Sequence, residues 1–597
     1  MKTWLRNLYE DRFFLFIPAF LCLCLAIALL YVIATYPRAV IEGVLMRWVP
    51  WGLRINFLFF LGGAYVCRHD AVRAFREATA EKENGGAVRN LGSLSAFFPS
   101  RKKAILLVVL VAAALLAVSA ATVRTHRIYF DEDIYENIGQ NIAHTGRTGM
   151  CNYGTFEYGE YYAHWLSYHK DPSGWPALIS FAFQLLGTNE LYAFFLNNLI
   201  FIASVLTVFF ISWALTGGYF PAFLAALVFS LIPHNLIWHN TAAAEPSAAL
   251  FAGLTVLCLV VYLRTGKSRH LFLLSTVIPL TCQMRPESAL IVPWVVMAAM
   301  ICLPSPNFPS REGKWKEVWM MGLLTAIFLL PHILHLYTVS GHSWGAEGPK
   351  FSTTFFWKNV CTNGLYYLNN RQFPVPFTAL ALVGLLFGRQ YALRWRLMIF
   401  TWFLLFWGVF LFFYAGSYQY GADVRFALLS FMPLAVLTGM GGGAIRDGIR
   451  KRGYGMQDAG GLIIAVLIFA WVQFLPLIHR EGQEAWGARY DHYYARKFIE
   501  KIPRRSIVLT HIPAMFLLWQ QNAIQTYAGI NNPDIISHLM ERYQGHVYFH
   551  YNYWCNITAD QNQKICQAIR DRYDLEEIAS AREQSYHYGL YKMRFKD

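Results

Sequence analysis

The chain has 597 residues, of which 56% are hydrophobic and only 15% are charged, and its net charge is +15. About a quarter of the residues of a soluble protein are charged. The low charge, a mean hydropathy of +0.33 and several nearly uncharged stretches exclude an ordinary soluble enzyme and predict a polytopic α-helical membrane protein. The positive charge does not indicate nucleic acid, because most basic residues lie in short loops between apolar stretches, as in cytoplasmic loops of membrane proteins.

Apolar stretches predict about thirteen transmembrane helices. The predicted spans are residues 13–35, 51–67, 104–122, 191–215, 220–237, 246–263, 271–284, 288–303, 318–338, 374–388, 397–414, 425–441 and 460–477. The first stretch is longer than the apolar core of a signal peptide, which has roughly 7–15 residues, so we expect the chain to retain it.

Basic loops set the expected orientation, because loops rich in lysine and arginine stay in the cytoplasm. Segment 68–103 contains eight such residues, and further basic loops lie at 264–269, 389–396 and 446–452. All four can be cytoplasmic only if one apolar stretch in the first half of the chain does not cross. The weakest candidate is a further apolar stretch at 175–187, which is not among the thirteen spans. Its roughly 13 residues give about 20 Å of helix against a hydrocarbon core of about 30 Å. We therefore expect a juxtamembrane helix there, at the outer surface.

The same orientation places the remaining polar segments together outside the cytoplasm. These segments are 123–190, 238–245, 285–287, 339–373, 415–424 and the tail 478–597. Arg38 and Arg47 are exceptions to the charge rule, because this topology puts them outside as well. Every functional candidate considered below lies on this outer face.

The tail differs from the rest of the chain in composition. Charged and turn residues are common after about residue 478, and short runs such as 506–510 and 547–549 are typical of strands. We predict three parts: residues 1–103 with two extra N-terminal helices, a transmembrane catalytic module at 104–477, and a C-terminal extracytoplasmic α/β domain at 478–597. Cys555 and Cys566 lie in this tail, where an oxidising compartment would permit a disulfide.

An acidic cluster of Asp131, Glu132 and Asp133 follows the third predicted span. Carboxylates beside a bilayer are costly to place, and they can take a proton from a hydroxyl or hold a cation. Acids in the first turn of a helix also cap it and interact with its dipole, which is the structural alternative for all three.

The segment that contains these acids, YFDEDIYENIGQNIAHTGRTG, resembles the first outer loop of the GT-C membrane glycosyltransferases. The likeness is greatest to the branch that holds protein O-mannosyltransferases and the lipid A aminoarabinose transferase. That branch has Asp-Glu-x-x-Tyr and then a helix that ends in Gly. Asp131, Glu132, Tyr135 and Gly146 match this pattern.

Further segments resemble the same branch. HKDP at 169–172 and LGTNE at 186–190 correspond to the segments that flank its juxtamembrane helix. Glu245 corresponds to the acid that opens a later span, and RF at 425–426 corresponds to an Arg-Tyr pair at the outer mouth of a span.

The likeness covers roughly residues 104–300 and 415–440, and the chain departs from it at three points. The second consecutive Pro after Pro172 is lacking, Glu245 replaces the commoner Asp, and RPE at 285–287 stands where Thr-Lys-Gly is frequent.

The resemblance implies an inverting transfer of a sugar from a polyprenyl-phosphate donor to an extracytoplasmic acceptor, which would be an envelope glycan, a lipid or a protein. It implies catalytic roles for Asp131, Glu132 and Glu245, with Asp131 as the base, donor-phosphate binding by Lys170, Arg285 and Arg425, and substrate binding by Tyr135, His169 and Asp133. A base typically contributes about 10²–10⁴ in rate, and cations neutralise the leaving phosphate. Because phosphate leaves readily, we expect no required cofactor, with a divalent metal as the alternative.

Structural alternatives exist for the other charged candidates. They are interfacial placement of Lys170, the ion pairs Arg285–Glu287 and Arg425–Asp423, and a first-turn position for Glu245.

Two other functions fit a membrane protein of this kind. A transporter or flippase of lipid-linked saccharides would have paired repeats with broken helices, and the sequence shows no such symmetry. A scaffold that binds envelope partners through its tail leaves the clustered acids unexplained. The expected location is the plasma (inner) membrane, with the active site and the C-terminal domain on the extracytoplasmic face.

Overall fold

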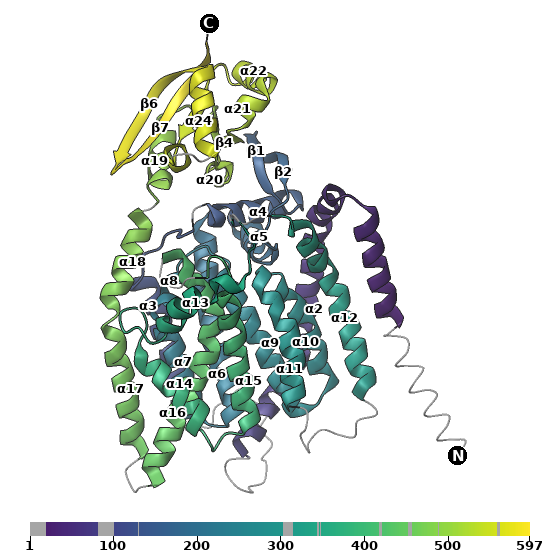
Figure 1. Ribbon diagram of the computed structural model, residues 1–597, viewed down its shortest axis with the longest axis vertical. Helices are drawn as coiled ribbons and strands as arrows, with labels where there is room; N and C mark the ends of the chain where they lie inside the picture. The colour runs from purple at the N-terminus through teal and green to yellow at the C-terminus, as the bar shows by residue number, and fades with distance from the viewer. Residues whose placement is uncertain are drawn as a thin grey trace, which may run out of the picture.

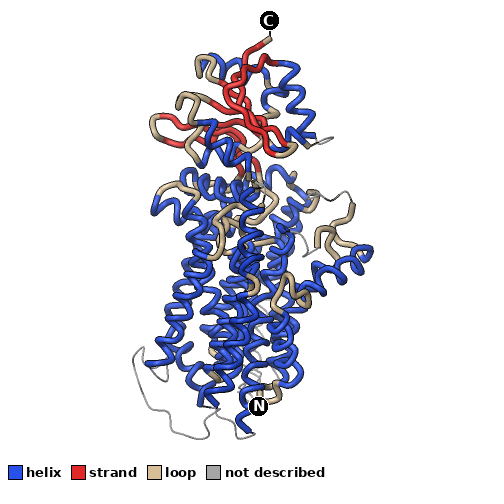
Figure 2. Tube along the Cα trace, turned by 90° about the vertical axis from the view of Figure 1, so that its left-hand side faces the viewer, coloured by secondary structure: helices blue, strands red, loops and turns tan. Residues whose placement is uncertain are grey.

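The helices form an elongated bundle with a β-sheet at one end, which we call the sheet end (Figure 1). The computed structural model describes residues 20–80, 101–128, 130–302, 314–342, 346, 348–416, 421–451, 456–487, 489–557 and 561–596. A view turned by 90° shows that all the strands gather beyond the same end of the bundle (Figure 2).

The helices of the bundle and its sheet end follow one another along most of the chain. They are Phe20–Thr35, α2 (Arg38–Ala80), α3 (Arg101–Ala120), α4 (Asp131–Thr145), α5 (Gly174–Leu186), α6 (Leu191–Thr216), α7 (Tyr219–Leu231), α8 (Pro233–Trp238), α9 (Glu245–Thr265), α10 (Ser268–Cys282), η2 (Pro286–Leu290), α11 (Ile291–Cys302), α12 (Lys314–Val339), α13 (Phe356–Asn359), α14 (Val375–Phe387), α15 (Leu393–Gly408), η6 (Gly421–Ala427), α16 (Leu428–Lys451), α17 (Met456–Val472) and α18 (Leu475–Gly487).

Eight helices in the described part of the chain are long and apolar enough to cross a membrane. Shorter apolar helices include α7, α14 and the segment Pro286–Cys302. The polytopic helical fold predicted from the sequence is confirmed, whereas the number of thirteen spans stays a prediction. Residues 13–19 of the first predicted span lie outside the described residues.

The bundle has a packed interior and an apolar exterior. Most residues of the apolar windows of α6, α9 and α16 are buried, whereas few of those in α3 and α12 are. Outward-facing side chains of α3 include Ile105, Val108 and Leu116. Since an apolar exterior is stable only in lipid, this distribution is that of a protein embedded in a membrane.

The sheet is built from two distant parts of the chain. Its seven strands lie in the order β2-β1-β4-β3-β5-β7-β6. The strands are β1 (Met150–Glu157), β2 (Glu160–Ser167), β3 (Ile507–Thr510), β4 (Asn522–Gln525), β5 (Val547–Tyr551), β6 (Tyr573–Glu583) and β7 (Tyr586–Phe595). Strands β3, β4 and β5 are parallel, and β1 joins them antiparallel to β4 through Tyr153–Ile524 and Gly154–Ala523. The predicted α/β tail therefore shares its sheet with a hairpin from the outer loop.

Helices of the tail connect and cover this sheet. They are α19 (Tyr490–Ile499), α20 (Pro513–Leu518), α21 (Ala528–Asn531), α22 (Pro533–Arg542), α23 (Tyr553–Asn556) and α24 (Gln561–Arg572). Cys555 on α23 and Cys566 on α24 form a disulfide with a Cα–Cα distance of 5.6 Å.

Helices α4 and α5 form a layer between the bundle and the sheet (Figure 1). Helix α4 ends at Gly146, whose φ of +69° is a left-handed conformation that glycine adopts without strain. The Gln140 side chain of α4 donates a hydrogen bond to the Leu517 carbonyl of α20 at 3.2 Å. Helix α4 therefore lies where the bundle and the tail meet.

Candidate active site

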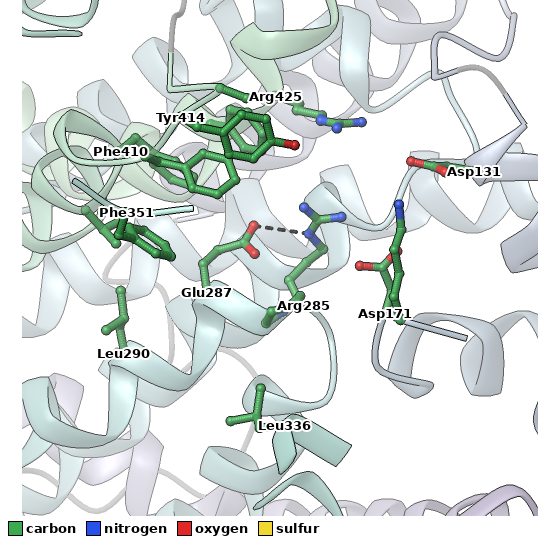
Figure 3. Close-up of a pocket in the computed structure, with 16 residues that line it drawn as sticks. Asp131, Asp171, Arg285, Glu287, Leu290, Leu336, Phe351, Phe410, Tyr414 and Arg425 are labelled. Carbon is green, nitrogen blue, oxygen red and sulfur yellow. Dashed lines mark hydrogen bonds and ion pairs between the residues drawn. The ribbon is translucent and has the colours of Figure 1, made fainter. Parts of the chain in front are cut away.

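A cavity of about 300 Å³ lies at the sheet end of the bundle, beside the start of α4. Its charged lining residues are Asp131, Lys170, Asp171, Arg285, Glu287 and Arg425, and its apolar lining includes Leu290, Leu336, Phe351, Phe410, Phe413 and Tyr414. Figure 3 shows the guanidinium groups of Arg285 and Arg425 and the carboxylate of Asp131 around one open space, with the aromatic rings to one side. The cavity therefore has a charged part and an apolar part.

The helical period brings two predicted residues to the same face of α4. Asp131 and Tyr135 are four positions apart, so both side chains point to one side of the helix. The Tyr135 hydroxyl donates a hydrogen bond to Asp171 Oδ2 at 3.1 Å, and Arg285 Nη1 donates to the Tyr135 oxygen at 3.4 Å. Tyr135 thus joins the first outer loop to the segment that carries Arg285.

A close backbone contact positions the segment that carries Lys170 and Asp171. The Gly174 N–H donates to the Gln283 carbonyl at 2.8 Å. A Cβ at Gly174 would collide with this carbonyl, so only glycine permits the approach. This contact holds Lys170 and Asp171 beside Arg285, two residues beyond Gln283.

Glu245 lies behind the cavity and holds two arginines. Its fully buried carboxylate is 3.3 Å from Arg285 Nη1 and 3.5 Å from Arg425 Nε. Glu287 accepts a further hydrogen bond from Arg285 Nε at 3.1 Å. Glu245 does not itself line the cavity, so in this arrangement it positions the two cations. The pairing of Arg285 with Glu287 that the sequence left open is present as well.

Three charged groups of the cavity remain available to a ligand. Arg425 is ion-paired with Glu245, but its buried Nε and Nη1 atoms have no hydrogen-bond partner in the described part of the chain. Among the described residues, neither Asp131 nor Lys170 has a side-chain hydrogen bond or an ion pair. A guanidinium, an ammonium and a carboxylate with unused hydrogen-bonding capacity suit an anionic group beside a hydroxyl.

Asp171 is a site residue that the sequence analysis did not single out. Burial by itself would raise the pKa of Asp171, but His169 and the cations around it lower that pKa to about 2. Asp171 is therefore ionised at neutral pH, accepts the Tyr135 hydroxyl and lies 3.8 Å from His169 Nδ1. The signal that could have identified it is a second charged residue next to Lys170 in the same motif.

The apolar wall was also missed. Phe351, Phe410 and Tyr414 come from loops and helix ends far from the acidic cluster in sequence. In a chain with 46 phenylalanines and 34 tyrosines, residue type alone could not distinguish these side chains from those that contact lipid.

Glu132 lies on another side of α4 and does not line the cavity. Its fully buried carboxylate accepts hydrogen bonds from the backbone N–H groups of Arg127 at 2.7 Å, Ile128 at 3.0 Å and Ala242 at 2.7 Å. Burial raises the pKa of Glu132 to about 7, and the three donors limit that rise. These contacts fasten the start of α4 to the loop before it and to the segment before α9.

Asp133 points toward the tail rather than the cavity. It accepts a hydrogen bond from Arg489 Nη2 at 2.8 Å and lies 3.3 Å from Nε2 of His492 on α19. Burial by itself would raise the pKa of Asp133, but Arg489 and the nearby histidines hold it well below its usual range. Of the nine predicted site residues, the cavity lining contains Asp131, Lys170, Arg285 and Arg425. Tyr135, His169 and Glu245 contact the lining residues, and Glu132 and Asp133 lie apart.

The solved structures that this chain resembles share its architecture. No protein-family model matches the chain, and no curated protein matches it in sequence. Its structure is similar to that of ArnT from Cupriavidus metallidurans bound to undecaprenyl phosphate, with a TM-score of 0.54 and 11% identity over 83% of this chain and 98% of that one. The apo state of the same ArnT has the same TM-score and identity over 82% of this chain. The protein has the GT-C fold.

A more distant similarity extends to an archaeal protein. An oligosaccharyltransferase from Archaeoglobus fulgidus in the apo form has a TM-score of 0.44 and 10% identity, over 81% of this chain and 74% of that one. The similarity to ArnT confirms, at the level of the fold, the GT-C resemblance predicted from the acidic loop.

Replacing Glu132 with Gln is expected to lower stability. The amide would present an N–H₂ group to backbone donors that need an acceptor, at a cost of about 1–3 kcal/mol for each buried donor left unpaired. The measurement is the melting temperature of the purified protein. Asp131→Asn is the matched control, because the neighbouring carboxylate has no such bonds, and it should melt like the wild type. Unchanged melting of Glu132→Gln would contradict this structural assignment.

Proposed function

We propose that the protein is an inverting glycosyltransferase that moves a sugar from a polyprenyl-phosphate donor to an extracytoplasmic acceptor. The single observation that carries the proposal is the cavity, whose Lys170, Arg285 and Arg425 adjoin a wall of aromatic and aliphatic side chains. A polyprenyl-phosphate sugar has the matching chemistry, with an anionic phosphate between a polar sugar and a long apolar chain. The acceptor would be an envelope glycan, a lipid or a protein.

The donor phosphate is assigned to Arg425 and Lys170. Arg425 Nε and Nη1 have no hydrogen-bond partner among the described residues besides the ion pair with Glu245, and the Lys170 side chain makes no contact of either kind there. Arg285 contributes positive charge from a fixed position, since Glu245 and Glu287 both hold it. The polyprenyl chain would leave along Leu290, Phe410 and their neighbours. The similar ArnT structure holds undecaprenyl phosphate, which supports a lipid phosphate of this class here.

Asp131 is assigned as the base. The acceptor hydroxyl oxygen would attack the anomeric carbon while the bond from that carbon to the phosphate oxygen breaks. The hydroxyl proton passes to the Asp131 carboxylate, and the electron pair of the broken bond stays on the polyprenyl phosphate, next to Arg425 and Lys170. A single displacement of this kind inverts the anomeric configuration. No metal ion is required in this scheme, because the cations supply the charge that stabilises the leaving group.

Tyr135, His169 and Asp171 form the remaining polar side of this site. The bond from Tyr135 to Asp171 and the contact of Asp171 with His169 fix three groups next to Lys170. We assign them to orienting the sugar and the base.

Asp131→Asn is expected to abolish most transfer, because the amide cannot accept the acceptor proton. Envelope glycolipids and glycoproteins would be compared by mass spectrometry in cells that lack the protein, express the wild type or express the variant. The glycan-modified species should fall by at least about 10²-fold at equal expression. Near-wild-type levels with Asp131→Asn would remove this residue from the role of base.

Arg425→Ala and Lys170→Ala are each expected to weaken binding of undecaprenyl phosphate by about 10-fold or more, because each removes a charge-assisted hydrogen bond. The measurement is a titration of the purified protein with this lipid. Arg450→Ala is the matched control, since Arg450 is an exposed arginine in the last turn of α16, at the opposite end of this helix from Arg425. Unchanged affinity in both test variants would show that the phosphate binds elsewhere.

The sheet end is assigned to the extracytoplasmic side of the plasma (inner) membrane. The basic loops support this orientation, and the Cys555–Cys566 disulfide supports it independently, because disulfides persist in oxidising compartments.

Cysteine labelling of intact cells tests this orientation. In a background without the exposed Cys24 and Cys361, Ser580→Cys on exposed β6 should react with a membrane-impermeant maleimide from outside. Arg450→Cys should react only after the membrane is permeabilised. The reverse pattern would invert the topology and place the cavity on the cytoplasmic side.

A further inference from the structure

A buried polar cluster lies on the face of α4 opposite the cavity. Its members are His126, Asp133, Glu136, Glu190 and His492, which we call the His126 cluster. They come from the loop before α4, from α4 itself, from the residue before α6, and from α19 of the tail. Asp133 and Glu136 are three positions apart and share a face of α4, whereas Asp131 lines the cavity and Tyr135 contacts its lining residues Asp171 and Arg285. The cluster is therefore separate from the proposed catalytic groups.

The side-chain atoms of the cluster converge on two overlapping groups of three. The His126, Glu136 and Glu190 ligand atoms all lie within 4.8 Å of one another, as do those of His126, Asp133 and His492. His126 Nε2 is 3.6 Å from Glu136 Oε1. His492 Nε2 lies 3.7 Å from Glu190 Oε2. His126 is common to both groups and lies at the centre of the cluster.

Among the residues that the structure describes, Glu136 has no hydrogen-bond partner that accounts for its burial. Its side chain is fully buried, and neither of its carboxylate oxygens has a hydrogen-bond partner in the described structure. Nε2 of His126, which is also buried, likewise lacks one. An unpaired carboxylate inside a protein costs several kcal/mol or more, so such groups normally take up a proton, pair with a cation or bind a metal.

The arginines around the cluster do not meet this need. Arg489 pairs with Asp133 at 2.8 Å, and Arg496 pairs with Glu190 at 2.8 Å. Each of these two arginines thus compensates one of the three carboxylates, and neither of them pairs with Glu136. A proton on Glu136 would not resolve the arrangement either, because 3.6 Å to His126 Nε2 is too long for a hydrogen bond.

We propose that the His126 cluster binds one divalent transition-metal ion, with His126, Glu136 and Glu190 as its ligands. Nitrogen and carboxylate ligands lie about 2.0–2.2 Å from zinc, so two ligands of a tetrahedral site are about 3.3–3.6 Å apart. The separation of His126 and Glu136 fits this spacing. Imidazole ligands favour zinc and similar ions over calcium and magnesium, which prefer oxygen.

An entry path for the ion is present. A cavity of about 340 Å³ is lined by His126, Glu190 and His492 and by residues of the exposed face of α19, among them Arg496 and Lys497. The other candidate metal-binding group among the described residues is His511 with Cys555 and Cys566, and both sulfur atoms of that group are in the disulfide. The His126 cluster is therefore the stronger metal candidate of the two.

A metal here would hold α4 to the loop before it and to the residue before α6, next to the contact with the tail. His126, Glu136 and Glu190 belong to the bundle side. Asp133 and Glu190 contact His492 of α19, and Glu190 also pairs with Arg496 of the same helix. An ion that fixes Glu136 fixes the rotation of α4 and with it the direction of Asp131. This inference does not depend on the proposed transfer reaction, and a failure of either leaves the other testable.

The experiment uses the full chain, purified with an affinity tag that contains no histidines. After chelation and removal of the chelator, the protein is titrated with Zn²⁺ and, in parallel, with Co²⁺, whose visible absorption reports tetrahedral coordination. We expect about one bound ion per chain and a higher melting temperature with the ion than without it. A wild-type protein that binds no Zn²⁺ and melts identically with and without it would overturn the proposal without recourse to any variant.

Variants locate the ion. Glu136→Gln and His126→Gln should each weaken Zn²⁺ binding by at least about 10-fold and change the Co²⁺ spectrum. The matched control is His144→Ala, an exposed histidine on the same helix that should bind Zn²⁺ like the wild type. Wild-type affinity in both cluster variants, at a size-exclusion profile equal to that of the wild type, would place any bound ion elsewhere and contradict the assignment.

Discussion

The contact on which the site depends is the buried carboxylate of Glu245 between two arginines. Glu245 opens α9, Arg285 precedes η2, and Arg425 lies just before α16. A buried charge is tolerated only when it is paired, so removing any one of the three would leave an uncompensated charge at the end of the bundle. The pairing therefore fixes the mutual position of three helix ends, and the cavity exists where those ends meet.

Helix α4 connects this arrangement to the tail. One face of the helix presents Asp131 to the cavity and Tyr135 to the lining residues Asp171 and Arg285, and the opposite face presents Asp133 and Glu136 to the His126 cluster. Glu132 fastens the beginning of the same helix through three backbone N–H groups. The side chains of Asp131, Glu132 and Asp133 point in three different directions from this helix. The position of the tail and the geometry of the cavity are therefore linked through one short helix.

The shared sheet extends this link. The hairpin β1–β2 belongs to the outer loop in sequence, yet it pairs with β4 of the tail. Edge strands are stable when another strand covers them, so the loop and the tail stabilise each other. The tail is for this reason an integral part of the sheet end. The composition of the chain changes at about residue 478, but the sheet includes strands from both sides of that boundary.

The sequence alone determined the helical membrane fold, the GT-C resemblance and four residues of the cavity lining, because hydropathy, charge and the acidic motif are local properties of the chain. It could not separate Asp131 from Glu132 and Asp133, since three consecutive acids look alike until the helix gives each a direction. It also could not find Asp171, Glu136 or the aromatic wall around Phe410. Those assignments depend on which residues become neighbours after folding, and only the tertiary structure decides that, because burial and pairing determine what each charged or aromatic group can do.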